Sequence, residues 1–197
     1  NVIKFAKFTD KQFILDIGSN DGTLLKIFKD NGFKKILGID PVKEIAEEAT
    51  NNGIQTIPEY MNIKNSKFIK DKFGIPNLIT ANNVFAHIDD MDEITDSIVS
   101  ILDKNGLFVF EISYLLDVIE KKLLGTIFHE HLSYYSLNTL KIYLNKKNME
   151  IVEVLRTDLQ GGSLICYVQH KEGSHQVSEN VIKLLDLEDS KKLNKLS

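Results

Sequence analysis

Short apolar runs alternate with segments in which apolar residues recur every three or four positions over the first half of the chain. The short runs are typical of strands buried on both faces, and the second pattern is typical of the helices that cover them. The expected strands are 12–17, 35–40, 54–58, 77–84 and 107–112. The expected helices are 22–31, 42–51, 63–73 and 91–101. This order predicts a parallel sheet with helices on both faces.

The pattern changes after the fifth expected strand. A helix is predicted over 114–124, and a second one follows Ser136, whose hydroxyl suits an N-cap. The apolar segments 150–154 and 164–169 are joined by a short link without a helix, which predicts an antiparallel hairpin. The expected fold is therefore α/β, a doubly wound, mostly parallel, Rossmann-like sheet of seven strands with a C-terminal antiparallel hairpin.

The polar end of the chain is set apart from this domain. We expect residues 1–171 to form the domain, because the sequence beyond them shows no obvious core to join. Residues 172–197 are expected to be a polar linker or a helix towards an absent C-terminal segment. The first residue is Asn1 rather than Met, which is consistent with a domain cut from a longer protein.

Composition narrows the classes of function. The 197 residues carry a net charge of -4, which argues against binding to a nucleic-acid backbone. The single cysteine, Cys166, lies in an apolar run and excludes a disulfide within the chain. The sequence contains no signal-peptide pattern and no apolar run near the roughly 20 residues that span a bilayer. A cytoplasmic protein without a membrane partner is expected.

Residues 13–22, FILDIGSNDG, combine a buried strand, a tight glycine turn and the start of a helix. This order predicts a nucleotide-like ligand at the carboxyl edge of a parallel sheet. Gly18 and Gly22 match the dinucleotide fingerprint, but Asn20 stands in place of its second glycine. Asparagine accepts a positive φ better than most residues, yet it leaves less room for a pyrophosphate. A ligand without phosphates is favoured.

Two acidic residues extend this site. Asp40 ends the next strand, where an acid accepts the ribose hydroxyls of a nucleoside. Asp16 lies below the glycine turn, where its carboxylate could help hold the amine of an amino-acid group. A phosphate-free nucleoside with an amino-acid arm describes S-adenosylmethionine. The plainer alternative is that the glycines form only a tight turn and that Asp40 is a helix cap.

The order of elements over residues 12–169 resembles the class I methyltransferases, in which five parallel strands precede two antiparallel ones. The resemblance implies S-adenosylmethionine as the cofactor. In that family the methionine part lies at the first turn, the ribose at the acid after the second strand, and the adenine beside the loop after the third strand, while the end of the fourth strand closes over the ligand. Carried over to this sequence, these positions are Gly18, Asn20, Gly22, Asp40, Glu59, Tyr60, Asn82 and Asn83.

Four further segments resemble the C-methyltransferases that act on nucleotide-linked 4-keto-deoxysugars. They are NNVFAHI at 82–88, FVFEISYL at 108–115, IFHEHLSYYS at 127–136 and LQGGSL at 159–164. Such enzymes need a base that removes a proton next to a ketone, so that the enolate can attack the methyl carbon. The resemblance implies a nucleotide-linked sugar as the substrate and flanking domains in a longer chain.

Histidines are the candidates for this chemistry. His131 is predicted to be the base, because an imidazole titrates near neutral pH. Glu130 would orient it or polarise a water, and His87 would hydrogen-bond the sugar oxygen that becomes the enolate oxygen. His87 could instead only line the cofactor pocket. No metal is expected, because the two histidines around Glu130 are two positions apart in one loop and have no clear third ligand.

One position departs from the sugar C-methyltransferases. Phe128 stands two residues before the Glu-His pair, where a tyrosine is expected. Either another group, such as Tyr134 or Tyr135, replaces that hydroxyl, or the protein acts on a different acceptor substrate. Three alternatives therefore stay open: an O- or N-methyltransferase acting on another small molecule, a cofactor-binding domain without activity of its own, and a nicotinamide-dependent oxidoreductase. Asn20 and the final hairpin both count against the last.

Overall fold

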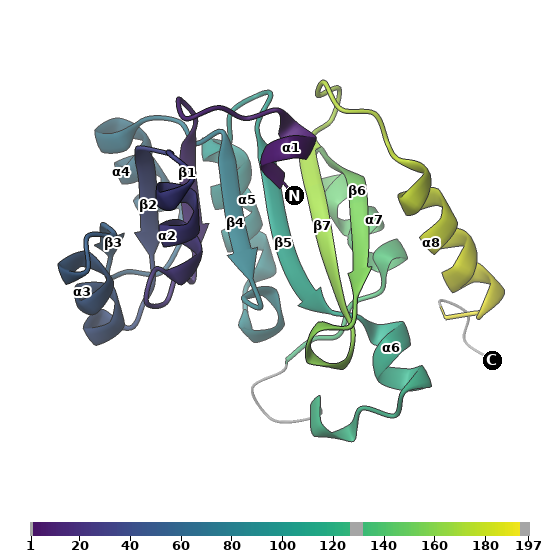
Figure 1. The fold of residues 1–197 in the computed structure, drawn as a ribbon. Helices are drawn as coiled ribbons and strands as arrows, with labels where there is room; N and C mark the ends of the chain where they lie inside the picture. The colour runs from purple at the N-terminus through teal and green to yellow at the C-terminus, as the bar shows by residue number, and fades with distance from the viewer. Residues whose placement is uncertain (1, 127–131, 194–197) are drawn as a thin grey trace. The chain divides into compact units, whose positions relative to one another are not determined.

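The computed structural model of the protein describes residues 2–126 and 132–193 (Figure 1). Within these residues seven strands form one mixed sheet in the order β3-β2-β1-β4-β5-β7-β6. The strands are β1 Phe13–Ile17, β2 Lys35–Ile39, β3 Thr56–Ile57, β4 Leu78–Asn82, β5 Leu107–Ser113, β6 Met149–Thr157 and β7 Ser163–His170. The predicted fold class, with its C-terminal antiparallel hairpin, is confirmed.

Helices precede, connect and follow the strands. They are α1 Val2–Ala6, α2 Thr23–Asp30, α3 Lys43–Asn51, α4 Ile63–Phe73, α5 Met91–Ile101, α6 Leu115–Glu120, α7 Leu137–Lys146 and α8 Glu179–Ser190. Short 3₁₀ helices lie at η1 Phe85–His87, η2 Leu124–Thr126 and η3 Leu159–Gly161. Across the described part of the chain, these helices are all too short or too polar to cross a bilayer.

The chain divides into two compact units. Unit 1 comprises Asn1–Asn82 and Asp90–Val109, and unit 2 comprises Asn83–Asp89 and Phe110–Ser197. The predicted cofactor residues up to Asn82 belong to unit 1. The predicted acceptor segments belong to unit 2, with two exceptions. Asn82 of the 82–88 segment and residues 108–109 of the 108–115 segment belong to unit 1.

Unit 1 is built around β1, which is buried at all five positions. Strands β2 and β4 flank β1 in parallel, which explains why β1 has no polar face toward solvent. Helix α2 packs on β1 and β2 through Leu25 and Phe28, while α4 packs against α5. In Figure 1, α2 lies in front of the strands and α5 lies behind them. Burial on both faces holds the carboxyl end of β1, and therefore the glycine turn, in place.

Unit 2 contains the hairpin of β6 and β7, which pair in antiparallel register from Met149 opposite His170 to Thr157 opposite Ser163. Helix α7 packs on β6. Ser136 is its N-cap, as predicted: the Ser136 hydroxyl accepts a hydrogen bond from the backbone N–H of Thr139 (3.2 Å). The Thr139 side chain in turn accepts one from the Ser136 N–H, which completes a capping box.

The polar end of the chain has a core to join, which the sequence pattern did not indicate. Helix α8 packs against β6 and α7, and it lies beside β6 in Figure 1. Val181 and Leu184 on α8 are buried. The link before α8 is held by the amide of Gln169, which is 1% exposed and exchanges hydrogen bonds with the backbone of His175 in both directions (2.8 and 3.0 Å). Helix α8 is therefore part of unit 2 and packs on its elements.

Candidate functional site

The glycine turn after β1 has the backbone conformation that the sequence predicts. Gly18, Asn20 and Gly22 have φ values of 66°, 50° and 80°. Asparagine is one of the few residues with a side chain that adopt this left-handed region readily, which explains how Asn20 replaces a glycine. The Gly18 N–H donates to the carbonyl of Ile39 at the end of β2 (2.9 Å), so the turn is tied to the neighbouring strand.

Asp40 links the end of β2 to this turn. Its Oδ2 accepts a hydrogen bond from the Asn20 N–H (2.9 Å), and its Oδ1 accepts one from the Val42 N–H (2.9 Å). The second bond holds Val42, which is the N-cap of α3, and α3 has no side-chain cap, so Asp40 is not the helix cap itself. A carboxylate offers about four acceptor positions, which leaves capacity for two ribose hydroxyls. Asp40 therefore suits a ligand for ribose.

Asp16 is a buried carboxyl group within β1. Its residue is 4% exposed, and its Oδ1 accepts a short hydrogen bond from the Thr80 hydroxyl on β4 (2.6 Å). Burial raises the pKa of Asp16 from its ordinary value of 3.8 to about 7, and the charge of Asp40 adds to this effect. An ionised carboxylate here is unfavourable without a nearby cation, so the position suits the amine of an amino-acid ligand.

One buried hydroxyl in the turn lacks a partner. Among the described residues, the Ser19 Oγ is the one buried side-chain polar atom that makes no hydrogen bond. It lies next to Gly38 of β2, where a Cβ would be only 2.4 Å from it. An unpaired buried polar group is costly, and a bound ligand is one way to satisfy it. These groups fit a ligand that carries hydroxyls and an amine.

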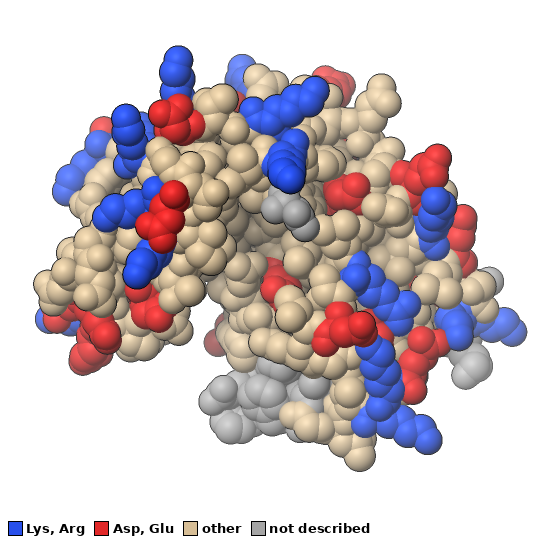
Figure 2. All heavy atoms as spheres, viewed as in Figure 1, with Lys and Arg blue, Asp and Glu red and all other residues tan. Residues whose placement is uncertain are grey.

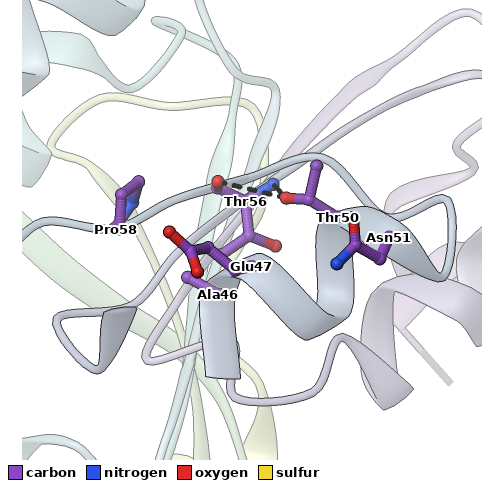
Figure 3. Close-up of a pocket in the computed structure, with 6 residues that line it drawn as sticks. All are labelled: Ala46, Glu47, Thr50, Asn51, Thr56 and Pro58. Atoms are coloured by element: carbon purple, nitrogen blue, oxygen red, sulfur yellow. Dashed lines mark hydrogen bonds between the residues drawn. The ribbon is translucent and has the colours of Figure 1, made fainter. Parts of the chain in front are cut away.

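The other predicted cofactor residues of unit 1 are more exposed. Glu59 and Tyr60 follow β3, and Tyr60 is 71% exposed. Asn82 is exposed at the end of β4. A cavity of about 400 Å³ lies between α3 and the segment after it, as Figure 3 shows. Its lining residues are Ala46, Glu47, Thr50, Asn51, Thr56 and Pro58, and none of them was predicted as a ligand contact.

In unit 2, the segment after β4 presents His87 at an exposed position. The ring of Phe85 is buried and stacks on Phe110 of β5, with centroids 5.0 Å apart. Asn83 has a φ of 55°, and its N–H donates to the carbonyl of Glu111 (2.9 Å). Two anchors therefore hold the short helix that ends at His87, so the imidazole is exposed on a fixed backbone.

Hydrogen bonds in unit 2 join described residues of the four segments that resemble sugar C-methyltransferases. The Leu132 N–H donates to the carbonyl of Ala86 (2.8 Å), which joins residues 132–136 of the third segment to the 82–88 segment. The Tyr135 hydroxyl donates to the carbonyl of Phe85 (3.0 Å). The Tyr114 N–H donates to the carbonyl of Gly162 (3.1 Å), which joins the 108–115 segment to the 159–164 segment.

Tyr135 also pairs with the end of β5. Its carbonyl accepts a hydrogen bond from the Leu115 N–H (3.0 Å), and an isolated bridge joins Tyr135 to Tyr114. Tyr135 is buried, which agrees with a packing role more than with a free catalytic hydroxyl. The predicted residues Glu130 and His131, with Phe128 beside them, lie outside the described residues.

A charged cluster near the 159–164 segment was not predicted. The Asp117 side chain of α6 is fully buried, and its two oxygens accept hydrogen bonds from the Arg156 guanidinium of β6 (both 2.9 Å). Lys121 makes a further ion pair with Asp117 (3.0 Å). Burial alone would raise the pKa of Asp117, but the bonds from Arg156 and Lys121 outweigh it and lower the pKa. Figure 2 shows acidic and basic side chains side by side around α6 and α8.

Gly162 packs directly on this cluster, which leads to a stability prediction. It has a φ of 152°, and a Cβ there would lie 2.3 Å from the Asp117 Cβ. We expect Gly162→Ala to lower the free energy of unfolding by about 3 kcal/mol, because it overpacks a buried ion pair. A Cβ at Gly125 has nothing within 4 Å, so Gly125→Ala is the matched control. Urea unfolding measures both, and equal stability of the two variants would contradict the prediction.

The chain is similar to known methyltransferases. Residues 2–154 match the family described as "Methyltransferase domain". The chain is 31% identical over 182 residues to the C-methyltransferase NovU of Streptomyces niveus, covering 92% of this chain. It spans 43% of that relative, less than half of its length.

Solved structures share the fold. An S-adenosylmethionine-dependent methyltransferase from Anabaena variabilis has a TM-score of 0.64 at 16% identity, covering 86% of this chain and 83% of that one. Magnesium protoporphyrin IX methyltransferase from Synechocystis has a TM-score of 0.60 at 13% identity, covering 81% and 74%. The chain therefore belongs to the methyltransferase domain family, and the predicted class, the S-adenosylmethionine-dependent methyltransferases, is confirmed.

Proposed function

We propose that this domain transfers a methyl group from S-adenosylmethionine to a carbon atom of a nucleotide-linked keto-deoxysugar. The observation that carries the proposal is the assembly, within unit 2, of the four segments that resemble sugar C-methyltransferases. The similarity to a C-methyltransferase over 92% of the chain supports the transfer to carbon. The acceptor and the activity of the longer protein are part of this proposal.

Unit 1 would hold the cofactor. Asp16 would pair with its amine, Asp40 would accept its ribose hydroxyls, and the backbone of the Gly18–Gly22 turn would lie against its methionine part. When bound, S-adenosylmethionine supplies an electrophilic methyl group. Glu59 and Tyr60 are proposed to border the adenine, and the exposed ring of Tyr60 is available for stacking. Asn82 and Asn83 are proposed to close over the ligand.

Unit 2 would activate the acceptor. The His131 imidazole would take the proton from the carbon next to the ketone, and the electron pair of that C–H bond would form the enolate. Glu130 would orient the imidazole. His87 would donate a hydrogen bond to the ketone oxygen, where the negative charge develops. Its exposure on an anchored backbone suits contact with a substrate oxygen.

The position of the new methyl group tests the proposal. We expect incubation with methyl-¹³C S-adenosylmethionine and a nucleotide-linked 4-keto-deoxysugar to give a ¹³C methyl signal bonded to carbon. Such a signal lies at a much lower chemical shift than O–CH₃ or N–CH₃, so one heteronuclear NMR spectrum distinguishes the products. Solvent deuterium should also exchange into the acceptor at the same carbon, because the base forms the enolate there.

Two other results would replace the proposal. An O–CH₃ or N–CH₃ signal would show that the domain methylates a heteroatom, where deprotonation is easier and His131 matters less. Binding of S-adenosylhomocysteine in calorimetry, combined with no product from any keto sugar, would identify a cofactor-binding domain without activity of its own. The measurement should be repeated with a longer chain, because the curated relative is more than twice as long as the matched region.

A further inference from the structure

The carboxylate of Glu188 is fully buried on helix α8 and serves three donors. Its Oε1 accepts hydrogen bonds from the Tyr114 hydroxyl (3.0 Å) and from the Leu137 N–H. Its Oε2 accepts one from the Asn138 N–H (2.9 Å). The donors come from the end of β5 and from the first turn of α7, which are far from α8 in sequence. A buried glutamate is costly unless its oxygens are satisfied, and here they are.

Glu188 completes the N-terminus of α7. Leu137 and Asn138 are the first two residues of this helix, whose first N–H groups have no partner within the helix. The Ser136 hydroxyl serves the third residue, Thr139, and Glu188 serves the two before it. A negative charge at this end of a helix is also favoured by the helix dipole. The cap of α7 is therefore shared between a local side chain and a distant one.

The same carboxylate holds a tyrosine that contacts the acceptor segments. The Tyr114 side chain is fully buried, and the Arg156 guanidinium lies over its ring, 5.3 Å from the centroid. The Tyr114 backbone bridges to Tyr135 and bonds to Gly162. Glu188 therefore links two of the four acceptor segments: it bonds to Tyr114 of one, and it fixes the start of α7, whose N-cap, Ser136, ends the other.

We propose that Glu188 is a positioning residue for the acceptor side of this methyltransferase. It holds Tyr114 and the start of α7, and it thereby holds residues 132–136, which follow the proposed catalytic segment. This inference rests on the proposed function for the identity of the acceptor. It assigns a role in the acceptor site to α8, a helix from the polar end of the chain.

Glu188→Gln tests this role, because it keeps the shape but turns one acceptor into an NH₂ group that faces a donor. We expect amide exchange at Leu137 and Asn138 to rise at least about tenfold. The kcat/KM for the keto sugar should fall about tenfold through a higher KM, while the Kd for S-adenosylhomocysteine stays within about twofold. Glu179→Gln is the matched control, since Glu179 lies on the same helix with an exposed side chain that forms an ion pair with Lys183.

Each outcome decides the inference. The inference is wrong if the Glu188→Gln variant shows the same amide exchange and the same kinetics as the Glu179→Gln variant. It is also wrong if amide exchange rises in Glu188→Gln but the KM for the acceptor does not change. If Glu188→Gln does not fold, Tyr114→Phe removes a single hydrogen bond and should raise the acceptor KM with exchange near wild type at Leu137. If the wild type methylates no keto sugar, the proposed function fails separately. Amide exchange over 132–138 then still decides whether Glu188 holds this segment.

Discussion

Replacing His131 with alanine should lower kcat for methyl transfer by about 10²- to 10⁴-fold, the usual contribution of a general base. A proton next to a ketone is only weakly acidic, so the enolate forms slowly when no base is aligned with it. The Kd for S-adenosylhomocysteine should stay at the wild-type value, because His131 is not among the proposed cofactor contacts, which lie in unit 1 apart from Asn83. Single-turnover kinetics and calorimetry measure the two quantities separately.

His129→Ala is the matched comparison for His131→Ala. Both histidines lie in the same segment, so a general disturbance of this segment would affect both variants alike. We expect the His129 variant to lose less activity, and we expect only the His131 variant to lose solvent deuterium exchange into the acceptor. A His131→Ala protein that methylates its substrate at full rate would remove the base assignment.

Replacing Asp16 with asparagine should stabilise the cofactor-free protein at pH 8 while weakening cofactor binding. Burial raises the pKa of Asp16 from 3.8 to about 7 in the folded protein. As the pH rises from about 4 to about 7, the unfolded chain loses this proton and the folded chain keeps it, so the free energy of unfolding falls across that window. The fall is complete above the folded pKa.

The size of this effect follows from the same pKa values. The difference between 3.8 and about 7 corresponds to roughly 4 kcal/mol, and we expect Asp16→Asn to recover about 2–4 kcal/mol at pH 8. The amide keeps an acceptor oxygen for the Thr80 hydroxyl. Urea unfolding at pH 4 and pH 8 checks the prediction, because the variant should lack the wild-type decline between these values.

Cofactor binding should change in the opposite direction. A cationic amine beside Asp16 favours its ionised form, so binding should release a proton below pH 7, and Asp16→Asn should bind about 10- to 100-fold more weakly. Calorimetry in buffers of different ionisation enthalpy measures the released proton. Asp21→Asn is the control: Asp21 lies in the same turn but is exposed, and hydrogen bonds with Thr23 lower its pKa. Equal behaviour of the two variants would contradict the role of Asp16.

Local patterns predicted the elements that are decided by short-range forces. Helix α5 runs over Met91–Ile101 as the spacing of its apolar residues predicts, and Asp90 caps it through the Glu93 N–H (2.9 Å). The helix after β5 is shorter than predicted: α6 ends at Glu120, and Lys122 adopts a φ of 52°. Strand β3 is also short, since it has only two residues before Pro58, which cannot donate to a sheet ladder.

The burial of charged residues could not be predicted from the sequence. No sequence pattern singled out Asp117 or Glu188, yet both are fully buried in the fold. Their burial depends on donors that come from distant segments, such as Arg156 for Asp117 and the first turn of α7 for Glu188. A carboxylate can leave water only where such partners satisfy it, and no local pattern records which partners the fold supplies.

The sequence by itself determined the fold class and the glycine turn with Asn20 at positive φ, because these follow from the periodicity of burial and from backbone conformations that few residues adopt. Its motifs and order of elements also indicated the family, through their resemblance to known methyltransferases. The tertiary structure alone decided that α8 belongs to unit 2 and that Glu188 caps α7. The physical reason is that helix propensity and hydrophobic spacing act between near neighbours. The burial of a charge depends instead on hydrogen bonds between residues that only the folded chain brings together.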